Sequence, residues 1–183
     1  MIGTDDWEPI SHYIPPPGSE TNEAPSDNLT FTPDGATLIG SDFSIFGAGR
    51  IVFMDGTTLE HLTQITGAHE GGVIDLAINT EGTLLASAGL DGVVRLWDVA
   101  TRTLVHEIPV SQVGHGLGGV DFVDDGRHLL VTAMATGDLH KLTVNTDELL
   151  DIARQRVTRG LTDTECDTYH LDPCPTLEEI RRG

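Results

Sequence analysis

The clearest pattern in the chain is a set of three short apolar runs between residues 73 and 98, separated by two acid–glycine pairs. The pairs are Glu81 with Gly82 and Asp91 with Gly92. Glycine supplies the positive φ that tight turns need, so acid–glycine pairs between apolar runs are typical of β-hairpins. The pattern predicts a three-strand meander, and another apolar run at 103–108 predicts a fourth strand.

The same turn pattern occurs three times along the chain. Two apolar residues at alternating positions, two further residues, an acid and a glycine end at Gly35, Gly82 and Gly126, which are 47 and 44 residues apart. A period of about 40–45 residues with four strands each is typical of the blades of a β-propeller. The sequence therefore predicts an all-β arrangement of three repeated units. Their expected bounds are 28–66, 67–112 and 113–145.

The middle unit resembles a WD repeat, one blade of a β-propeller, because of His69, the Asp91 turn, and Trp97 followed by Asp98. The resemblance implies a partial β-propeller of about three four-stranded WD-repeat blades. It also implies that four residue types form a hydrogen-bonded network inside the blade. By position these are His69, Ser87, Asp91 and Trp97. A buried indole N–H and a buried imidazole need partners, which a hydroxyl and a carboxylate supply. The resemblance implies a structural network and not a catalytic triad.

The two outer units depart from this pattern. In the first unit, Phe53 or Met54 stands near the tryptophan position. In the third unit, Leu142 stands at the tryptophan position and Thr136 at the aspartate position, while His115 lies two residues out of frame. We therefore expect no polar network in either outer unit, and expect apolar packing in its place.

Three blades are too few for a closed ring, because closed propellers have about 4–8 blades and an open array leaves strand edges exposed. The chain is expected either to be the end of a longer propeller or to complete a ring with copies of itself or with another chain. The first reading is favoured by the helical tail expected at 146–183. Asn145 with Glu148, and Thr162 with Glu165, match helix capping boxes. The tail resembles the one that follows the final blade in large bacterial WD-repeat signalling proteins, and we expect it to pack on the last blade.

Charge limits the classes of partner. The chain has 183 residues and a net charge of −19, so no nucleic acid is expected as a partner, because phosphate contacts need Lys and Arg. Anionic membranes are disfavoured for the same reason, and no run approaches the ~20 apolar residues of a membrane span. Residues 1–27 contain five prolines and six acids without Lys or Arg, which predicts an acidic, Pro-rich disordered leader. With two cysteines, both near the end of the chain, no disulfide-built domain is suggested, and a cytoplasmic location is expected.

One cluster suggests metal chemistry. Cys166, His170 and Cys174 are spaced by four, and zinc accepts such ligands. Pro173 and Pro175 interrupt a helix, however, and Asp172 or Asp167 would have to supply the fourth ligand. Packing is the favoured role, and we expect no metal, no cofactor and no catalytic residue.

The sequence therefore predicts a non-catalytic protein–protein interaction module, placed by resemblance in the C-terminal part of a bacterial signalling or regulatory protein. Its partner would be another protein, further propeller blades, or a second copy in a homo-oligomer. The alternative is the sensor end of a STAND-type NTPase or transcriptional regulator, with the catalytic or DNA-binding part outside this chain.

Overall fold

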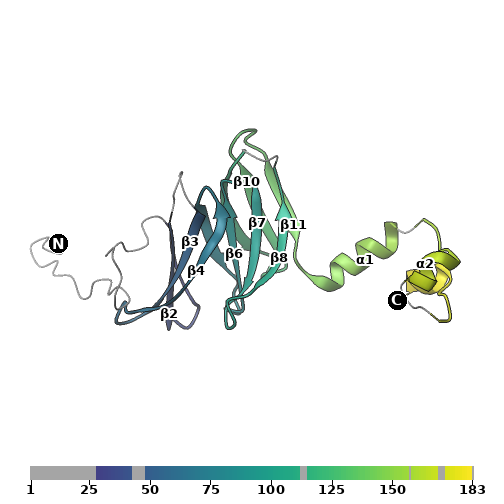
Figure 1. Cartoon of the computed structure of the whole chain (residues 1–183), viewed down its shortest axis with the longest axis horizontal. Helices are drawn as coiled ribbons and strands as arrows, with labels where there is room; N and C mark the ends of the chain where they lie inside the picture. Colours follow the sequence, from purple (N-terminus) through teal and green to yellow (C-terminus); the bar gives the residue numbers. More distant parts are fainter. Residues whose placement is uncertain (1–27, 43–47, 112–114, 157, 169–171, 183) are drawn as a thin grey trace, which may run out of the picture. The chain divides into compact units, whose positions relative to one another are not determined.

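The computed structural model describes residues 28–42, 48–111, 115–156, 158–168 and 172–182. The chain divides into two compact units, Met1–Leu142 and Thr143–Gly183. The first unit consists of antiparallel sheets and the second contains three short helices (Figure 1). The predicted fold class, a mostly β partial propeller with a helical tail, is confirmed. The expected leader at 1–27 lies outside the described residues.

Three sheets follow one another along the chain. The first is formed by β1 (Leu29–Phe31), β2 (Thr37–Asp42), β3 (Ala48–Asp55) and β4 (His61–Glu70). The second is formed by β5 (Val73–Ile78), β6 (Leu84–Gly89), β7 (Val93–Asp98) and β8 (Leu104–Pro109). The third is formed by β9 (Leu117–Val123), β10 (His128–Ala133) and β11 (Leu139–Thr143). Each sheet is a meander in which neighbouring strands are consecutive in sequence.

The third sheet has three strands in the described residues, where the sequence predicted about four. After β11 the chain enters helix α1 (Thr146–Arg156) in place of a fourth strand. The side-chain oxygen of Asn145 accepts a hydrogen bond from the backbone N–H of Glu148 at 2.9 Å. This cap satisfies a helix N-terminus directly after β11 and so favours the helix over a strand.

The strand β4 crosses the boundary that the sequence suggested between the first two units, residues 66 and 67. It continues to Glu70 and pairs with β3 of the first sheet, for example Ile65 with Ile51. His69 therefore belongs to the first sheet, whereas the sequence placed it in the middle blade. One sequence repeat is shared between two sheets.

Each of the three sheets has a buried leucine at an equivalent position. Leu38, Leu85 and Leu129 each lie three residues after the turn glycine of their sheet, and all three are buried. Leu85 pairs with Trp97, and Leu38 pairs in the same way with Met54. Met54 rather than Phe53 therefore occupies the tryptophan position of the first sheet.

The main core lies between the first and second sheets. Successive side chains of a strand point to opposite faces, so alternate residues of β2 and β3 point toward the second sheet. The buried members of this core are Ile39, Ile51, Phe53, Ala68, Val73, Leu76, Leu85 and Trp97. The third sheet packs through β9 against β5 and β6. The apolar alternation of the strands therefore stacks the sheets face to face.

The second unit contains α1, α2 (Asp163–Thr168) and α3 (Leu177–Arg182). Thr162 and Glu165 form the predicted capping box, with the Thr162 N–H donating to the Glu165 carboxylate at 2.8 Å. A disulfide joins Cys166 to Cys174. This corrects the expectation that the cysteines only pack. Bonded sulfurs offer no thiolate, so the zinc site considered for these residues loses two ligands, and His170 lies outside the described residues.

Candidate functional site: the polar network between the first and second sheets

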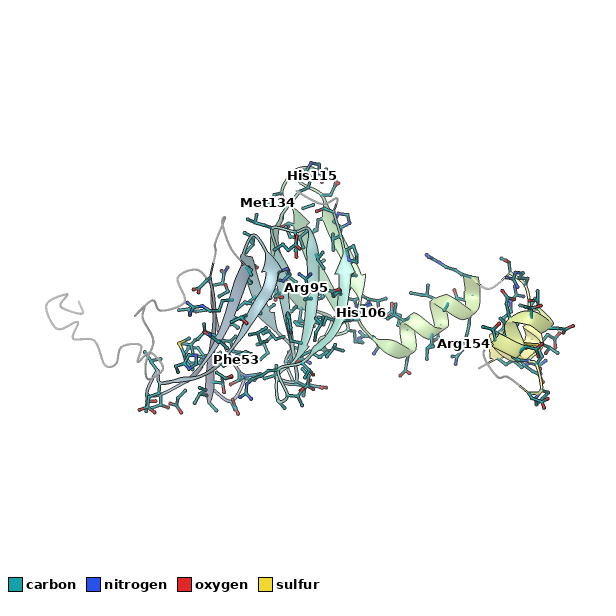
Figure 2. The ribbon with its side chains drawn as sticks, viewed as in Figure 1. Phe53, Arg95, His106, His115, Met134 and Arg154 are labelled. Carbon is teal, nitrogen blue, oxygen red and sulfur yellow. A yellow bond between two sulfur atoms is a disulfide. The ribbon has the colours of Figure 1, made fainter. Side chains whose placement is uncertain are left out.

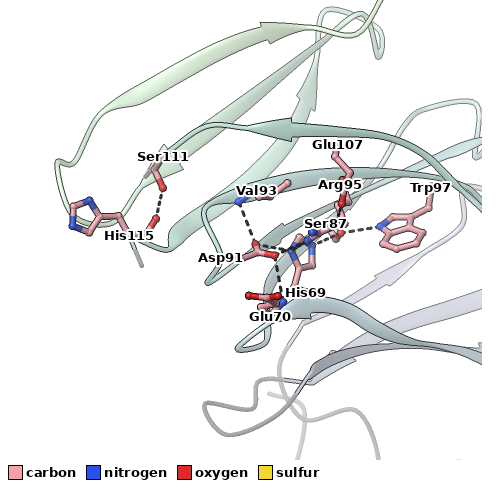
Figure 3. Close-up of polar contacts among 10 residues, drawn as sticks. All are labelled: His69, Glu70, Ser87, Asp91, Val93, Arg95, Trp97, Glu107, Ser111 and His115. Atoms are coloured by element: carbon pink, nitrogen blue, oxygen red, sulfur yellow. Dashed lines mark hydrogen bonds and ion pairs between the residues drawn. The ribbon is translucent and has the colours of Figure 1, made fainter. Parts of the chain in front are cut away.

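The four residues singled out by the resemblance lie on different elements and meet at the junction of two sheets (Figure 3). His69 comes from β4, Ser87 from β6, Asp91 from the turn after β6, and Trp97 from β7. His69 and Ser87 are buried, at 1 % and 0 % exposed. Because His69 belongs to the first sheet, the network joins two sheets, whereas the resemblance implied that it lies within one blade.

The hydrogen bonds form a continuous chain. The Trp97 indole N–H donates to the Ser87 hydroxyl oxygen at 2.9 Å, and that oxygen lies 2.7 Å from Nε2 of His69. Nδ1 of His69 lies 2.9 Å from Oδ1 of Asp91. One arrangement of protons satisfies every group: Nδ1–H donates to Asp91, and the Ser87 hydroxyl donates to Nε2.

Asp91 is the acceptor on which the network converges. Its carboxylate also accepts hydrogen bonds from the backbone N–H groups of Glu70, at 3.3 Å, and Val93, at 3.2 Å. Burial alone raises the pKa of Asp91, but hydrogen bonds from His69 and Arg95 outweigh it, so the pKa lies well below its ordinary value. The carboxylate is therefore held ionised at neutral pH, as a fixed acceptor.

Arg95 is a member of this cluster that the sequence reasoning missed. Its Nη1 lies 2.6 Å from Oδ2 of Asp91, and its Nε donates to Glu107 of β8 at 2.6 Å. Nδ1 of His69 contacts the other oxygen of this carboxylate, Oδ1, so the two side chains share Asp91 as their acceptor. Arg95 precedes Trp97 by two residues in one strand, and this period of two places both on the same face. The spacing of two residues between Arg95 and Trp97 was the feature of the sequence that could have identified Arg95 as a member of the cluster.

Gly89 provides the space that His69 occupies. A Cβ atom added at this glycine would lie 2.1 Å from Nδ1 of His69 and 2.5 Å from Oδ1 of Asp91. Real Cβ atoms do not approach other atoms so closely, so the imidazole and any larger side chain at position 89 exclude each other. The glycine is thus part of the site although it makes no hydrogen bond within it.

The corresponding place between the second and third sheets is an open pocket. By alignment of Gly137 with Gly92, Thr136 stands at the position of Asp91 and His140 at that of Arg95. Both line a pocket of about 310 Å³, together with Val110, Ser111, His115, Ala133, Ala135 and Asp138. His115 and Met134 lie at this end of the sheets (Figure 2). Apolar packing was expected at this place, and the structure has a partly polar pocket there.

The described residues contain no cluster of His, Cys, Asp and Glu with the geometry of a metal site. Among the described helices, none is long and apolar enough to cross a membrane. The arrangement of His69, Ser87 and Asp91 also lacks the geometry of an accessible nucleophile, because the Ser87 oxygen is buried and bonded to both Trp97 and His69. Its hydrogen bonds connect β4 of the first sheet with β6 and β7 of the second.

Comparison with known proteins bears on the middle of the chain. Residues 60–98 match the family described as WD domain, G-beta repeat. The chain is 29 % identical over 133 residues to Echinoderm microtubule-associated protein-like 1 of Rattus norvegicus, covering 68 % of this chain and 16 % of the relative. It is 28 % identical over 153 residues to Autophagy-related protein 18 of Saccharomyces cerevisiae, covering 81 % of this chain and 30 % of the relative.

The aligned part thus spans about a sixth to a third of the length of these relatives. The matched segment begins one residue before β4 of the first sheet and ends with β7 of the second, and the polar network joins these same two strands. The family match covers residues 60–98, and the similarity to these relatives extends over more of the chain.

Proposed function

We propose that this chain is a non-catalytic protein-interaction module whose binding surface is formed by the outer strands of its sheets. The observation that carries the proposal is the outer edge of β8, the last strand of the second sheet. In β8, Leu104 is 44 % exposed and Val105 56 % exposed. An edge strand offers unpaired backbone donors and acceptors, and exposed apolar side chains add affinity, so such edges recruit partners.

The role of WD-repeat proteins as interaction modules supports this proposal. The polar network is proposed to be structural, keeping the second sheet in register so that β8 presents a defined edge. The proposed partner is another protein, further propeller blades or a second copy of this chain. A net charge of −19 favours a partner with a basic surface.

The kind of protein to which this chain belongs and its location in the cell are also part of this proposal. Placement in the C-terminal part of a bacterial signalling protein, or at the sensor end of a STAND-type NTPase or transcriptional regulator, rests on the tail pattern. The relatives named above are eukaryotic and lend these assignments no support. A cytoplasmic location is likewise a proposal that follows from composition.

Sizing chromatography with light scattering at low and high salt tests the proposal. We expect the purified chain to self-associate, and we expect the double variant Leu104→Lys, Val105→Lys to shift it toward the monomer. The matched control changes Leu149→Lys and Leu150→Lys, which are equally exposed leucines of the other unit. A natural chain that is a stable, cooperatively unfolding monomer would refute association through open edges. NTP hydrolysis by the purified chain would overturn the non-enzyme assignment.

A further inference from the structure

The pocket between the second and third sheets combines apolar walls with an acidic group. Val110, Ala133 and Ala135 provide the apolar part of its lining, and Asp138 provides a carboxylate. Its volume of about 310 Å³ is at the lower end of the roughly 300–1,000 Å³ of ligand pockets, so it suits a group the size of one side chain. Two hydroxyls and two imidazoles complete the lining, those of Ser111, Thr136, His115 and His140.

Hydrogen bonds hold both sides of this pocket in place. On the side of the second sheet, the Ser111 N–H donates to the Gly92 carbonyl at 3.1 Å, and the Ser111 hydroxyl donates to the His115 carbonyl (Figure 3). On the side of the third sheet, the Ala133 N–H donates to the Asp138 carbonyl at 2.9 Å. The pocket is therefore formed in the free chain, and a ligand does not have to order its walls on binding.

The charges of the sheets favour a cationic ligand. Residues 28–142 contain fourteen acids and five basic residues. Each basic residue already has a partner elsewhere in the sheets: Arg50 has Asp42, Arg95 has Asp91, Arg102 has the ring of Phe53, Arg127 has the carbonyl of Asp124, and Lys141 has the carboxylate of Asp124. Within the described residues no ion pair involves Asp138. A cation for this carboxylate therefore comes from another molecule.

An anionic ligand fits the pocket less well. The Asp138 carboxylate would repel it, and like charges brought together oppose binding. The Ser111 hydroxyl has one proton, which it already donates to the His115 carbonyl, so toward a ligand it offers only acceptor lone pairs. The pocket thus asks for hydrogen-bond donors and positive charge.

We propose that the pocket binds an arginine side chain of a protein partner, an inference that rests on the proposed function and names the chemistry of its partner. The guanidinium lies against Asp138 and the alkyl stem covers Val110 and Ala135. A guanidinium has five N–H donors, which the carboxylate, the hydroxyls and neutral imidazoles can accept, and its flat face stacks on rings where an ammonium does not. Val110 directly follows β8, so a partner held by the edge of β8 can place a side chain here.

Arginine blocked at both ends, as the Nα-acetyl methylamide, tests the pocket without a strand that could pair with β8. Saturation-transfer NMR on the full chain at pH 8, where histidine side chains are generally neutral, measures its binding. Citrulline, lysine and glutamate in the same blocked form are the matched probes. We expect arginine to bind about fivefold tighter than its neutral isostere citrulline, and tighter than lysine. Equal binding of arginine and citrulline, or a preference for lysine or glutamate, would overturn the proposal.

Variants locate the probe in the pocket. Asp138→Asn should weaken arginine binding about fivefold, a modest factor because the carboxylate is exposed. The matched control is Asp121→Asn, an exposed acid of β9 in the same sheet, which should leave binding unchanged. Ala135→Leu fills the pocket from an exposed position and should abolish binding, with circular dichroism to check that the sheets are intact. Unchanged binding in both pocket variants would contradict the proposal.

The outcome is separable from the test of the β8 edge. If Leu104→Lys, Val105→Lys leaves the association state of the chain unchanged while blocked arginine still binds selectively, the proposed edge is wrong and the pocket stands. If that variant shifts the chain toward the monomer and arginine shows no selective binding, the pocket assignment alone is overturned.

Discussion

The two junctions between sheets arise from the same repeat pattern in the sequence, but different side chains lie in each of them. Between the first and second sheets, His69, Asp91 and Arg95 form a partly buried polar network around one carboxylate. Between the second and third sheets, Thr136 and His140 stand at two equivalent positions and line an open pocket of about 310 Å³. A polar junction of this kind therefore needs the complete set of residues in register.

The second junction retains a simpler link between its sheets. The side-chain oxygen Oδ2 of Asp75 accepts a hydrogen bond from the backbone N–H of Val120 at 2.9 Å. This bond joins β5 to β9, next to buried apolar side chains of both sheets such as Leu76 and Leu117. Within the described residues this junction thus combines apolar stacking with a bond from a backbone N–H to a carboxylate, whereas the first junction carries a network of side chains.

The largest effect is expected from Trp97→Ala. The substitution removes a side chain of the main core and also the indole donor to Ser87, so it should lower the free energy of unfolding by about 3–5 kcal/mol. The control is Leu142→Ala, at the equivalent but half-buried position of the third sheet, which should cost less. Urea unfolding monitored by circular dichroism measures both. Equal losses would remove the distinction between the junctions.

Gly89→Ala should follow, at about 1–3 kcal/mol, because its Cβ atom would overlap the His69 imidazole. The cost should fall in a background that carries His69→Ala, since the ring that collides is then absent. The same urea titrations compare the single and double variants. Additive losses would show that Gly89 does not act through His69.

Asp91→Asn should lower the free energy of unfolding by about 1–3 kcal/mol, because an amide cannot accept all the donors that converge on the carboxylate. A double-mutant cycle with His69→Ala should show coupling between the two positions. Thr136→Ala, at the equivalent exposed position, should change stability by no more than about 0.5 kcal/mol. A cycle without coupling would rule out the network as a unit.

Stability should also depend on the ionisation of Asp91. The pKa of Asp91 in the folded chain lies below the ordinary value of 3.8, so its contribution is complete above about pH 4 and is lost as the pH falls further. Between pH 7 and pH 3, the natural chain should lose more stability than Asp91→Asn. Thermal unfolding at a series of pH values tests this. Parallel profiles for the two proteins would mean that other carboxylates account for the acid sensitivity.

The smallest effect is expected from Thr136→Asp, which transfers the acid to the second junction without its partners. His115 is out of frame and His140 replaces the arginine, so the new carboxylate stays near the surface and should change stability by less than about 0.5 kcal/mol. A clear stabilisation in thermal unfolding would show that the pocket accepts a network after all.

The sequence predicted local features well because turn glycines and alternating apolar residues act within a few positions. The four strands of the middle sheet and the capping box at Thr162 follow from such patterns. A further capping box, in which the Thr176 N–H donates to Glu179 at 2.7 Å, was present in the sequence but overlooked, and with it helix α3.

Other features could not be read from the sequence because they depend on which strands pair. Strand β4 carries the start of one repeat while pairing with the sheet of the preceding one, so His69 was placed in the wrong layer. The Cys166–Cys174 disulfide likewise depends on how the segment after α2 folds back, which spacing alone does not determine. The packing of the helical tail on a blade remains a prediction.

The position of His69 on β4 has a consequence during synthesis of the chain on the ribosome. β4 completes the first sheet, so every strand of that sheet is synthesised before Ser87, Asp91 and Trp97. Trp97 follows His69 by 28 residues, which corresponds to roughly 1–6 s of translation. The order of translation therefore matches the order in which the two layers are joined.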